Sequence, residues 1–156
     1  PRIHYDDFLR GIQIGKAKVV REGKKIAILN FGARLNECLI AEENLRKKGV
    51  NASIVDARFA KPIDENLIWQ LATNHEVIIT IEEGSIGGFG AHVSNFLNDK
   101  NLLDSNLKFR SMILPDKFID QDKPENMYKS AGLDALSIEN KVLEVLNSKV
   151  IVKKIN

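Results

Sequence analysis

The chain has 156 residues, of which 44% are hydrophobic, so it is long enough for one domain with a buried core. A formal net charge of +2 provides no general basic surface of the kind that nucleic acid or an anionic membrane attracts. The single cysteine, Cys38, excludes an internal disulfide and is typical of a reducing compartment. No apolar run approaches the roughly 20 residues of a membrane span, so we expect a cytoplasmic protein that binds neither membrane nor nucleic acid.

The first 15 residues show no hydrophobic periodicity, and we interpret them as a linker or arm from a preceding domain. Because the chain begins at Pro1 and not at Met, we expect it to be part of a longer protein. Residues 16–20 and 25–31 are predicted strands on either side of a turn, and they are expected to pair as a hairpin.

Helices and strands alternate after this point. Predicted helices cover residues 34–48, 65–75, 91–97, 124–131 and 134–146, and predicted strands cover residues 52–59, 77–81 and 107–114. This order favours an α/β three-layer sandwich, whose mixed sheet is mostly parallel with one antiparallel strand at 16–20. We place the domain at residues 16–147 and treat residues 148–156 as a tail, either an edge strand or an ordered arm.

Individual residues define several of these helices. Asp64 is the expected cap of the second helix and Gly132 the expected end of the fourth. The inward side chains expected in the first and last helices are Leu35, Cys38, Leu39 and Leu45, and Leu136, Val142, Leu143 and Leu146.

Four segments follow predicted strands directly: residues 30–34, 56–62, 82–90 and 114–122. In a parallel sheet all four lie on one edge, and ligands and partners of such sheets bind at that edge. We therefore expect the functional face of the domain there.

The segment 82–90 has the most unusual composition, with two carboxylates and four glycines between a strand and a helix. Gly88 and Gly90 begin a dinucleotide-binding pattern, but Val93 occupies the third glycine position. Glu82 and Glu83 would also repel a phosphate. Nucleotide binding is therefore an alternative and not the leading hypothesis.

Catalytic and metal sites are not indicated. Glu82 and Glu83 are adjacent on a strand, so their side chains point to opposite faces. The histidines, His4, His75 and His92, lie in different segments without ligand spacing, and Cys38 lies in a helix stripe as an inert thiol. We predict no catalytic residue and no metal site in this chain.

A contact surface explains the same edge better. Charges of both signs suit pairing with another domain or subunit, and glycines on a turn permit close backbone approach. The alternative is an ordinary solvated turn region, which accounts for Pro62 and Pro115 but less well for the glycines. The expected interdomain or dimer contact residues are Arg58, Lys61, Glu82, Glu83, Gly84, Gly87, Gly88, Gly90 and Asp116.

Five segments in order carry a family resemblance: 56–64 (DARFAKPID), 82–90 (EEGSIGGFG), 114–119 (LPDKFI), 127–128 (MY) and 131–135 (AGLDA). Together they resemble the C-terminal domain of 1-deoxy-D-xylulose-5-phosphate synthase, from about residue 14 to 146. The Glu-Glu-Gly turn alone also resembles the last domain of transketolases and of 2-oxoacid dehydrogenase β subunits.

The resemblance implies a homodimeric enzyme that depends on thiamine diphosphate and magnesium. Such an enzyme joins pyruvate to glyceraldehyde 3-phosphate with loss of carbon dioxide, for isoprenoid and thiamine synthesis. The family binds cofactor and metal in two preceding domains, so this domain is expected to be inactive alone and to serve assembly. The resemblance also suggests Arg2 as the remnant of an arginine near the substrate phosphate, although Ile3 stands where glycine is expected. A free-standing nucleotide-binding regulatory module is the alternative of a different class.

Overall fold

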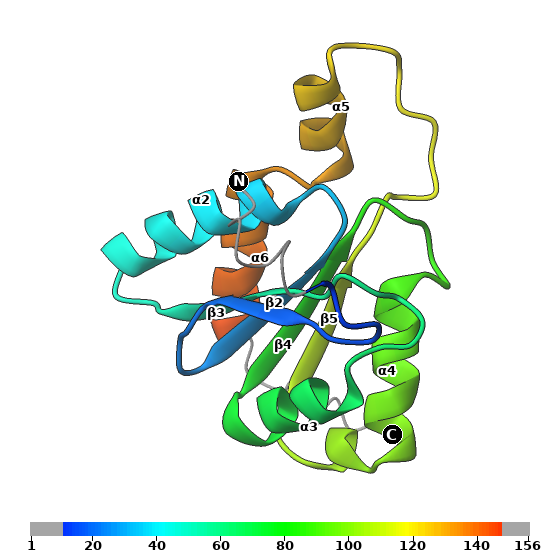
Figure 1. The fold of residues 1–156 in the computed structure, drawn as a ribbon. Helices are drawn as coiled ribbons and strands as arrows, with labels where there is room; N and C mark the ends of the chain where they lie inside the picture. Colours follow the sequence, from blue (N-terminus) through cyan, green and yellow to red (C-terminus); the bar gives the residue numbers. More distant parts are fainter. Residues whose placement is uncertain (1–10, 148–156) are drawn as a thin grey trace, which may run out of the picture.

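The computed structural model describes residues 11–147, which form a five-stranded sheet with helices on both faces (Figure 1). The strands are β1 (Lys18–Arg21), β2 (Ile26–Phe31), β3 (Ala52–Asp56), β4 (Val77–Glu82) and β5 (Lys108–Met112). The helices are α2 (Leu35–Lys47), α3 (Glu65–Asn74), α4 (Phe89–Asp99), the 3-10 turn η1 (Leu102–Asp104), α5 (Pro124–Ala131) and α6 (Ala135–Asn147). The expected arm residues 1–10 and tail residues 148–156 lie outside the described part.

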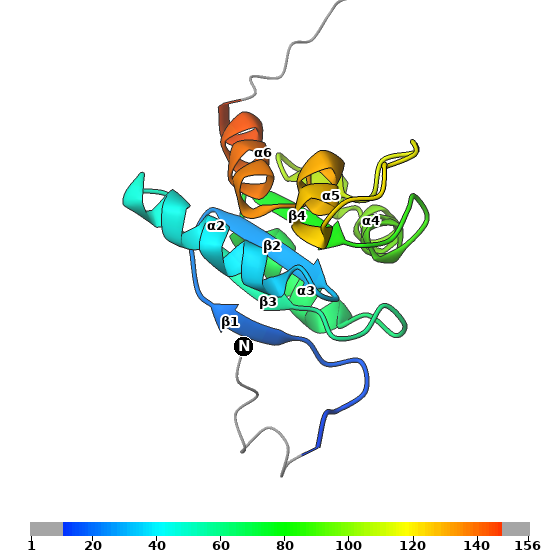
Figure 2. The same cartoon turned by 90° about the horizontal axis from the view of Figure 1, so that it is seen from above.

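The sheet has the strand order β1-β3-β2-β4-β5, with β1 at one edge (Figure 2). Strands β2 to β5 pair in parallel, and only β1 runs antiparallel to its neighbour β3. The predicted mixed sheet with one antiparallel strand is therefore confirmed.

The predicted hairpin between the first two strands is wrong, because β1 pairs with β3 and not with β2. All but the last residue of β2 are buried, so β2 needs a strand on each side, whereas β1 is only half-buried and suits an edge. The connection between them crosses the start of β3 at Gly23. A Cβ on Gly23 would lie 2.3 Å from the carbonyl carbon of Ala52, so the crossing requires glycine.

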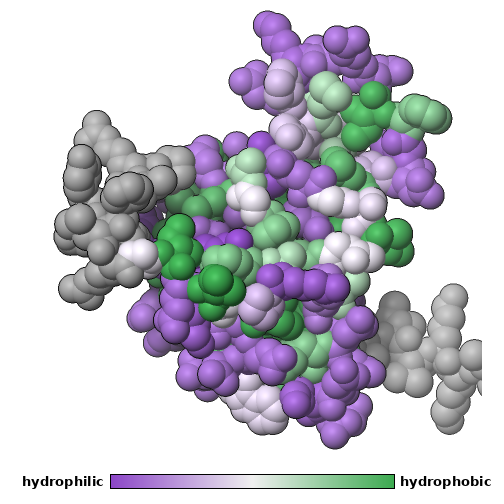
Figure 3. All heavy atoms as spheres, turned by 45° about the vertical axis from the view of Figure 1, so that its right-hand side comes forward, coloured by the Kyte–Doolittle hydropathy of each residue, from purple (hydrophilic) through white to green (hydrophobic). Residues whose placement is uncertain are grey.

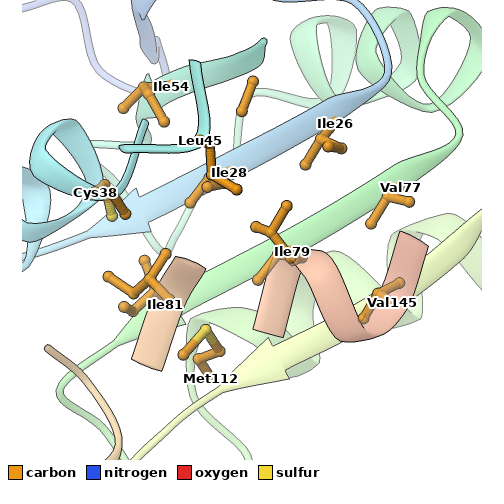
Figure 4. Close-up of a cluster of buried hydrophobic side chains, with 14 of the residues drawn as sticks. Ile26, Ile28, Cys38, Leu45, Ile54, Val77, Ile79, Ile81, Met112 and Val145 are labelled. Atoms are coloured by element: carbon orange, nitrogen blue, oxygen red, sulfur yellow. The ribbon is translucent and has the colours of Figure 1, made fainter. Parts of the chain in front are cut away.

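Two hydrophobic clusters fill the space between the layers. One lies between the sheet and helices α2 and α6, and includes Ile28, Leu45 and Val142 (Figure 4). The other lies between the opposite face and helices α3 and α4, and includes Leu29, Ile68 and Val93. The three-layer arrangement follows from the continuous apolar composition of β2 and β4, which must be covered on both faces.

One of the four inward side chains expected in the last helix is wrong. Val142 is buried and Leu143 and Leu146 pack against the same cluster, as expected, whereas Leu136 is 56% exposed and Ile138 and Val145 are buried in addition. The spacing of four and three residues places the buried side chains on one face, and Leu136 falls off that face. The other local signals are confirmed, since Asp64 caps α3 by accepting from the Leu67 N–H at 3.2 Å.

A hydrogen-bond chain joins the β1–β2 crossing to the end of α3. The Gly23 N–H donates to the Ser53 hydroxyl oxygen at 2.9 Å, and Ser53 Oγ lies 2.9 Å from His75 Nε2. His75 Nδ1 lies 3.0 Å from the Leu71 carbonyl oxygen. Since a carbonyl only accepts, Nδ1 carries the proton and the neutral Nε2 accepts from Ser53. Burial lowers the pKa of His75, against the opposing effect of the Leu71 carbonyl.

We predict that the domain loses stability in acid partly through His75. Because the pKa of His75 is lowered in the folded domain, the unfolded chain binds the proton more readily. The contribution of neutral His75 to the free energy of unfolding is therefore complete above the unfolded pKa of about 6.5 and is lost as pH falls through the folded pKa. Urea unfolding between pH 8 and 5.5 should show a smaller pH dependence in His75→Gln than in the parent. Equal slopes in the two proteins would refute the assignment.

Candidate functional site

The carboxyl ends of β2, β3, β4 and β5 meet at one edge of the sheet, as predicted (Figure 1). We call this the carboxyl edge; its loops are residues 32–34, 57–64, 83–88 and 113–123. Helix α5 and the loop before it project beyond this edge, at the top of Figure 1.

Glu82, the last residue of β4, determines the shape of the glycine-rich turn. Its side chain is buried, with Oε2 accepting from the Phe89 N–H at 2.9 Å and Oε1 accepting from the Gly90 N–H at 2.8 Å. These amides begin α4, whose N-cap residue Gly88 has no side chain to satisfy them. The carboxylate thus occupies the position at a helix N-terminus that a phosphate would take.

The glycines of this turn are explained by contacts inside the domain. A Cβ on Gly84 or Gly88 would lie 2.7 or 2.2 Å from the Oε2 atom of Glu82. A Cβ on Gly90 would lie 2.6 Å from the Ser111 hydroxyl oxygen, and Gly87 has a φ of +96°. Gly84 and Gly88 therefore make room for the Glu82 carboxylate, independently of any contact between this turn and another protein. A role in contact with another protein stays a prediction for these residues.

Glu83 points away from Glu82, as the strand alternation predicted, and belongs to a cluster with Arg34 and Tyr128. Arg34 Nε lies 2.7 Å from Glu83 Oε1, although the two atoms are not aligned as a hydrogen bond. The Arg34 guanidinium also stacks 3.6 Å from the centroid of the Tyr128 ring. A hydrogen bond to Glu83 raises the pKa of Tyr128.

This cluster connects three segments of the carboxyl edge: the start of α2, the β4 turn and α5. Arg34 stands at the N-terminus of α2, where a cation is unfavourable, and Glu83 offsets that charge. Tyr128 was absent from the expected contact residues. Its only signal in the sequence was its place in the Met-Tyr segment of the family resemblance.

The β3–α3 loop holds Arg58 and Lys61, both expected contact residues. Arg58 has a φ of 59°, and its N–H donates to Asp56 Oδ1 at 3.2 Å, while its Nε lies 3.9 Å from Asp56 Oδ2. Lys61 is exposed and precedes a cis peptide bond to Pro62. Asp116, in the loop after β5, is exposed as well. The structure thus brings all the expected contact residues to the carboxyl edge. Their role in contact with another protein stays a prediction.

The N-terminal arm reaches the domain at the same edge. Asp64 Oδ2 accepts from the Ala17 N–H at 3.1 Å, and Asp64 Oδ1 lies 3.5 Å from Lys16 Nζ. A Cβ on Gly15 would lie 2.9 Å from Pro62 Cγ, so the arm passes close to the β3–α3 loop. The chain therefore enters β1 beside Pro62 and Asp64.

The histidines and the cysteine of residues 11–147 lie on separate elements: His92 in the first turn of α4, Cys38 in α2 and His75 at the end of α3. His75 bonds Ser53 near the start of β3, at the opposite end of the sheet. Burial raises the pKa of the Cys38 thiol to about 12, so it is unreactive. Within the described range no three His, Cys, Asp or Glu residues are grouped to hold a metal ion, and no helix is long and apolar enough to cross a membrane.

Comparison with known proteins identifies the fold. Residues 15–138 match the family model described as transketolase, C-terminal domain. The chain belongs to this family. A solved structure described as a split gene transketolase, an inactive β4 tetramer, is 27% identical with a TM-score of 0.78. The match covers 86% of the present chain and 43% of that chain.

A second similar structure is the transketolase from Campylobacter jejuni subsp. jejuni NCTC 11168. It is 18% identical with a TM-score of 0.56, over 83% of this chain and 18% of that one, and at this identity it supports the fold alone. The present transketolase C-terminal domain thus spans less than half the length of either relative.

We predict that Glu82→Gln destabilises the domain by about 2 kcal/mol or more, because it removes one of two buried charge-assisted acceptors and the charge itself. Glu83→Gln is the matched control, since Glu83 is partly exposed, and it should cost less than about 1 kcal/mol. Urea unfolding followed by circular dichroism measures both. Equal losses in the two variants would contradict the role of Glu82.

Proposed function

We propose that this chain is the C-terminal domain of a 1-deoxy-D-xylulose-5-phosphate synthase. In that enzyme it would complete the assembly of a cytoplasmic homodimer that condenses pyruvate with glyceraldehyde 3-phosphate and releases carbon dioxide. The domain itself would span residues 16–147, with 148–156 as a tail. Its role is structural: it presents the carboxyl edge to another part of the enzyme.

The observation that carries this proposal is the pair of segments 56–64 and 114–119 within a transketolase C-terminal domain. Family membership supports a thiamine diphosphate enzyme in general, and these two segments resemble the synthase in particular. Both lie on the carboxyl edge, on either side of the Glu82 turn in the strand order. The segments that favour the synthase thus lie at the edge for which we propose contact with another part of the enzyme.

The residues present do not fit the cofactor implied by the family. The N-terminus of α4 already holds the Glu82 carboxylate, so a diphosphate would have to displace a buried anion. The described residues also offer no group of ligands for magnesium. We therefore assign thiamine diphosphate and magnesium to other domains and derive no catalytic step here.

A transketolase is the second candidate, because the split gene transketolase is the relative with 27% identity. That relative is described as an inactive β4 tetramer. The last domain of a 2-oxoacid dehydrogenase β subunit is compatible with the fold but has no further observation in its favour. A nucleotide-binding regulatory module is disfavoured by the occupied helix N-terminus.

We predict that the complete gene product releases carbon dioxide from pyruvate only when glyceraldehyde 3-phosphate, thiamine diphosphate and magnesium are present. The 156-residue chain alone should show no turnover and no calorimetric binding of thiamine diphosphate. Ketol transfer between sugar phosphates without pyruvate consumption would favour a transketolase. Micromolar binding of ADP or NAD by the 156-residue chain would favour the regulatory module.

Arg2, which lies outside the described residues, is proposed to bind the phosphate of glyceraldehyde 3-phosphate. In the complete enzyme, Arg2→Ala should raise the KM for glyceraldehyde 3-phosphate about tenfold or more and leave the KM for pyruvate unchanged, since a charged hydrogen bond is lost. Arg21→Ala, on the exposed edge strand, is the control. If Arg2→Ala changed the KM of both substrates, or of neither, Arg2 would not be the residue that binds this phosphate.

A further inference from the structure

The most exposed apolar side chains of residues 11–147 are confined to one edge of the domain. Four large hydrophobic residues are at least 60% exposed: Ile12 at 60%, Ile14 at 73%, Ile86 at 86% and Phe118 at 105%. Ile86 lies in the β4 turn and Phe118 in the loop before α5, both at the carboxyl edge. Ile12 and Ile14 precede Gly15, which packs on Pro62 at the same edge. We call these four residues the apolar rim.

The two loops that carry Ile86 and Phe118 leave the domain side by side. The Leu114 N–H donates to the Gly84 carbonyl oxygen at 2.9 Å, which joins the bases of the loops. Figure 3 shows hydrophobic side chains standing out from a mainly hydrophilic surface on this side of the molecule, including the projecting lobe at the top. A hollow of about 270 Å³ below the β4 turn, between α4 and β5, is lined by Ile86, Phe109 and Ile113 among others.

Some charges near the rim are paired within the domain, whereas Lys61, Asp116 and Lys117 are exposed. Arg34 pairs with Glu83, Arg58 with Asp56, and Lys16 with Asp64. A partner therefore meets internally paired charges, the exposed Asp116 and Lys117 beside Phe118, and apolar tips that are in water. Several large, exposed apolar side chains at one edge favour an interaction with another protein surface.

We propose that the apolar rim is the docking surface for the cofactor-binding part of the same polypeptide, upstream of residue 1, with Ile86 and Phe118 as its anchors. This inference rests on the proposed function. Two observations select this partner. Lys16 and Ala17, which follow the arm, are held by Asp64 at the carboxyl edge, so a domain joined to the arm is kept near this edge at high effective concentration. In addition, the match covers 43% of the split gene transketolase chain, so 57% of that chain lies outside the matched region.

A second copy of this chain is the competing occupant. It would approach from solution, without the covalent connection that raises the effective concentration of an upstream domain. We therefore make self-association an outcome of the test and not the proposal.

Hydrogen exchange compares the complete gene product with the 156-residue chain. We expect residues 84–88 and 113–123 to be protected in the complete protein relative to the shorter chain. Ile86→Ser and Phe118→Ser should each accelerate exchange in these segments of the complete protein about tenfold or more. The free energy gained by burying one large apolar side chain changes a docking equilibrium constant by more than about tenfold. Ile40→Ser, at an exposed position on α2, is the matched control and should leave these segments unchanged.

Two results would overturn the proposal. One is equal exchange of these segments in the complete protein and the shorter chain. The other is protection in the shorter chain that rises with concentration and is lost in Phe118→Ser, which would assign the rim to a second copy. Protection in the complete protein without turnover of pyruvate and glyceraldehyde 3-phosphate would support the rim and refute the synthase. Circular dichroism confirms that each variant is folded.

Discussion

The contact between the Glu82 carboxylate and the start of α4 is the constraint on which the carboxyl edge depends. A helix that begins at Phe89 leaves its first amides unsatisfied, and Glu82 accepts from two of them. The chain must then reverse tightly over the carboxylate, which is possible only where Gly84 and Gly88 carry no Cβ. The turn also fixes the direction of Glu83 toward Arg34, and through Arg34 the position of Tyr128 and α5.

The same contact removes the chemistry that this kind of fold usually supports at this place. Parallel α/β sheets bind phosphates at helix N-termini on the carboxyl edge. Here the helix dipole is already matched by an internal anion, and the neighbouring acid is paired with Arg34. The groups that could bind a ligand at this edge instead hold the loops of the domain itself in fixed positions. Fixed loops are suitable for the proposed docking against another domain.

The sequence was sufficient where the evidence is local and periodic, and insufficient where two distant segments meet. The buried runs of β2 and β4 and the Asp64 cap were predictable from short windows. The β1–β3 pairing was not, because it depends on the approach of Gly23 to Ala52, 29 residues away in the chain. Gly84 and Gly88 were conspicuous in the sequence. Only the structure shows that they make room for the carboxylate of Glu82 from the preceding strand.

At the candidate site, Arg34 and Glu83 were recognised as edge residues from the sequence. Their shared contact with Tyr128 could not be predicted, because it depends on the position of α5.

Internal pairing at the carboxyl edge has a consequence for how a partner is recognised. Charges held by partners inside the domain are already ordered, so docking adds little further loss of side-chain freedom. The backbone bond between Leu114 and Gly84 orders the two loop bases in the same way. In the proposed docking a partner gains free energy by covering Ile86 and Phe118 with a complementary surface, and it must also accommodate the exposed Asp116 and Lys117 beside Phe118. A charged or flat surface would leave those side chains in water, and the edge discriminates against it without any repulsive contact.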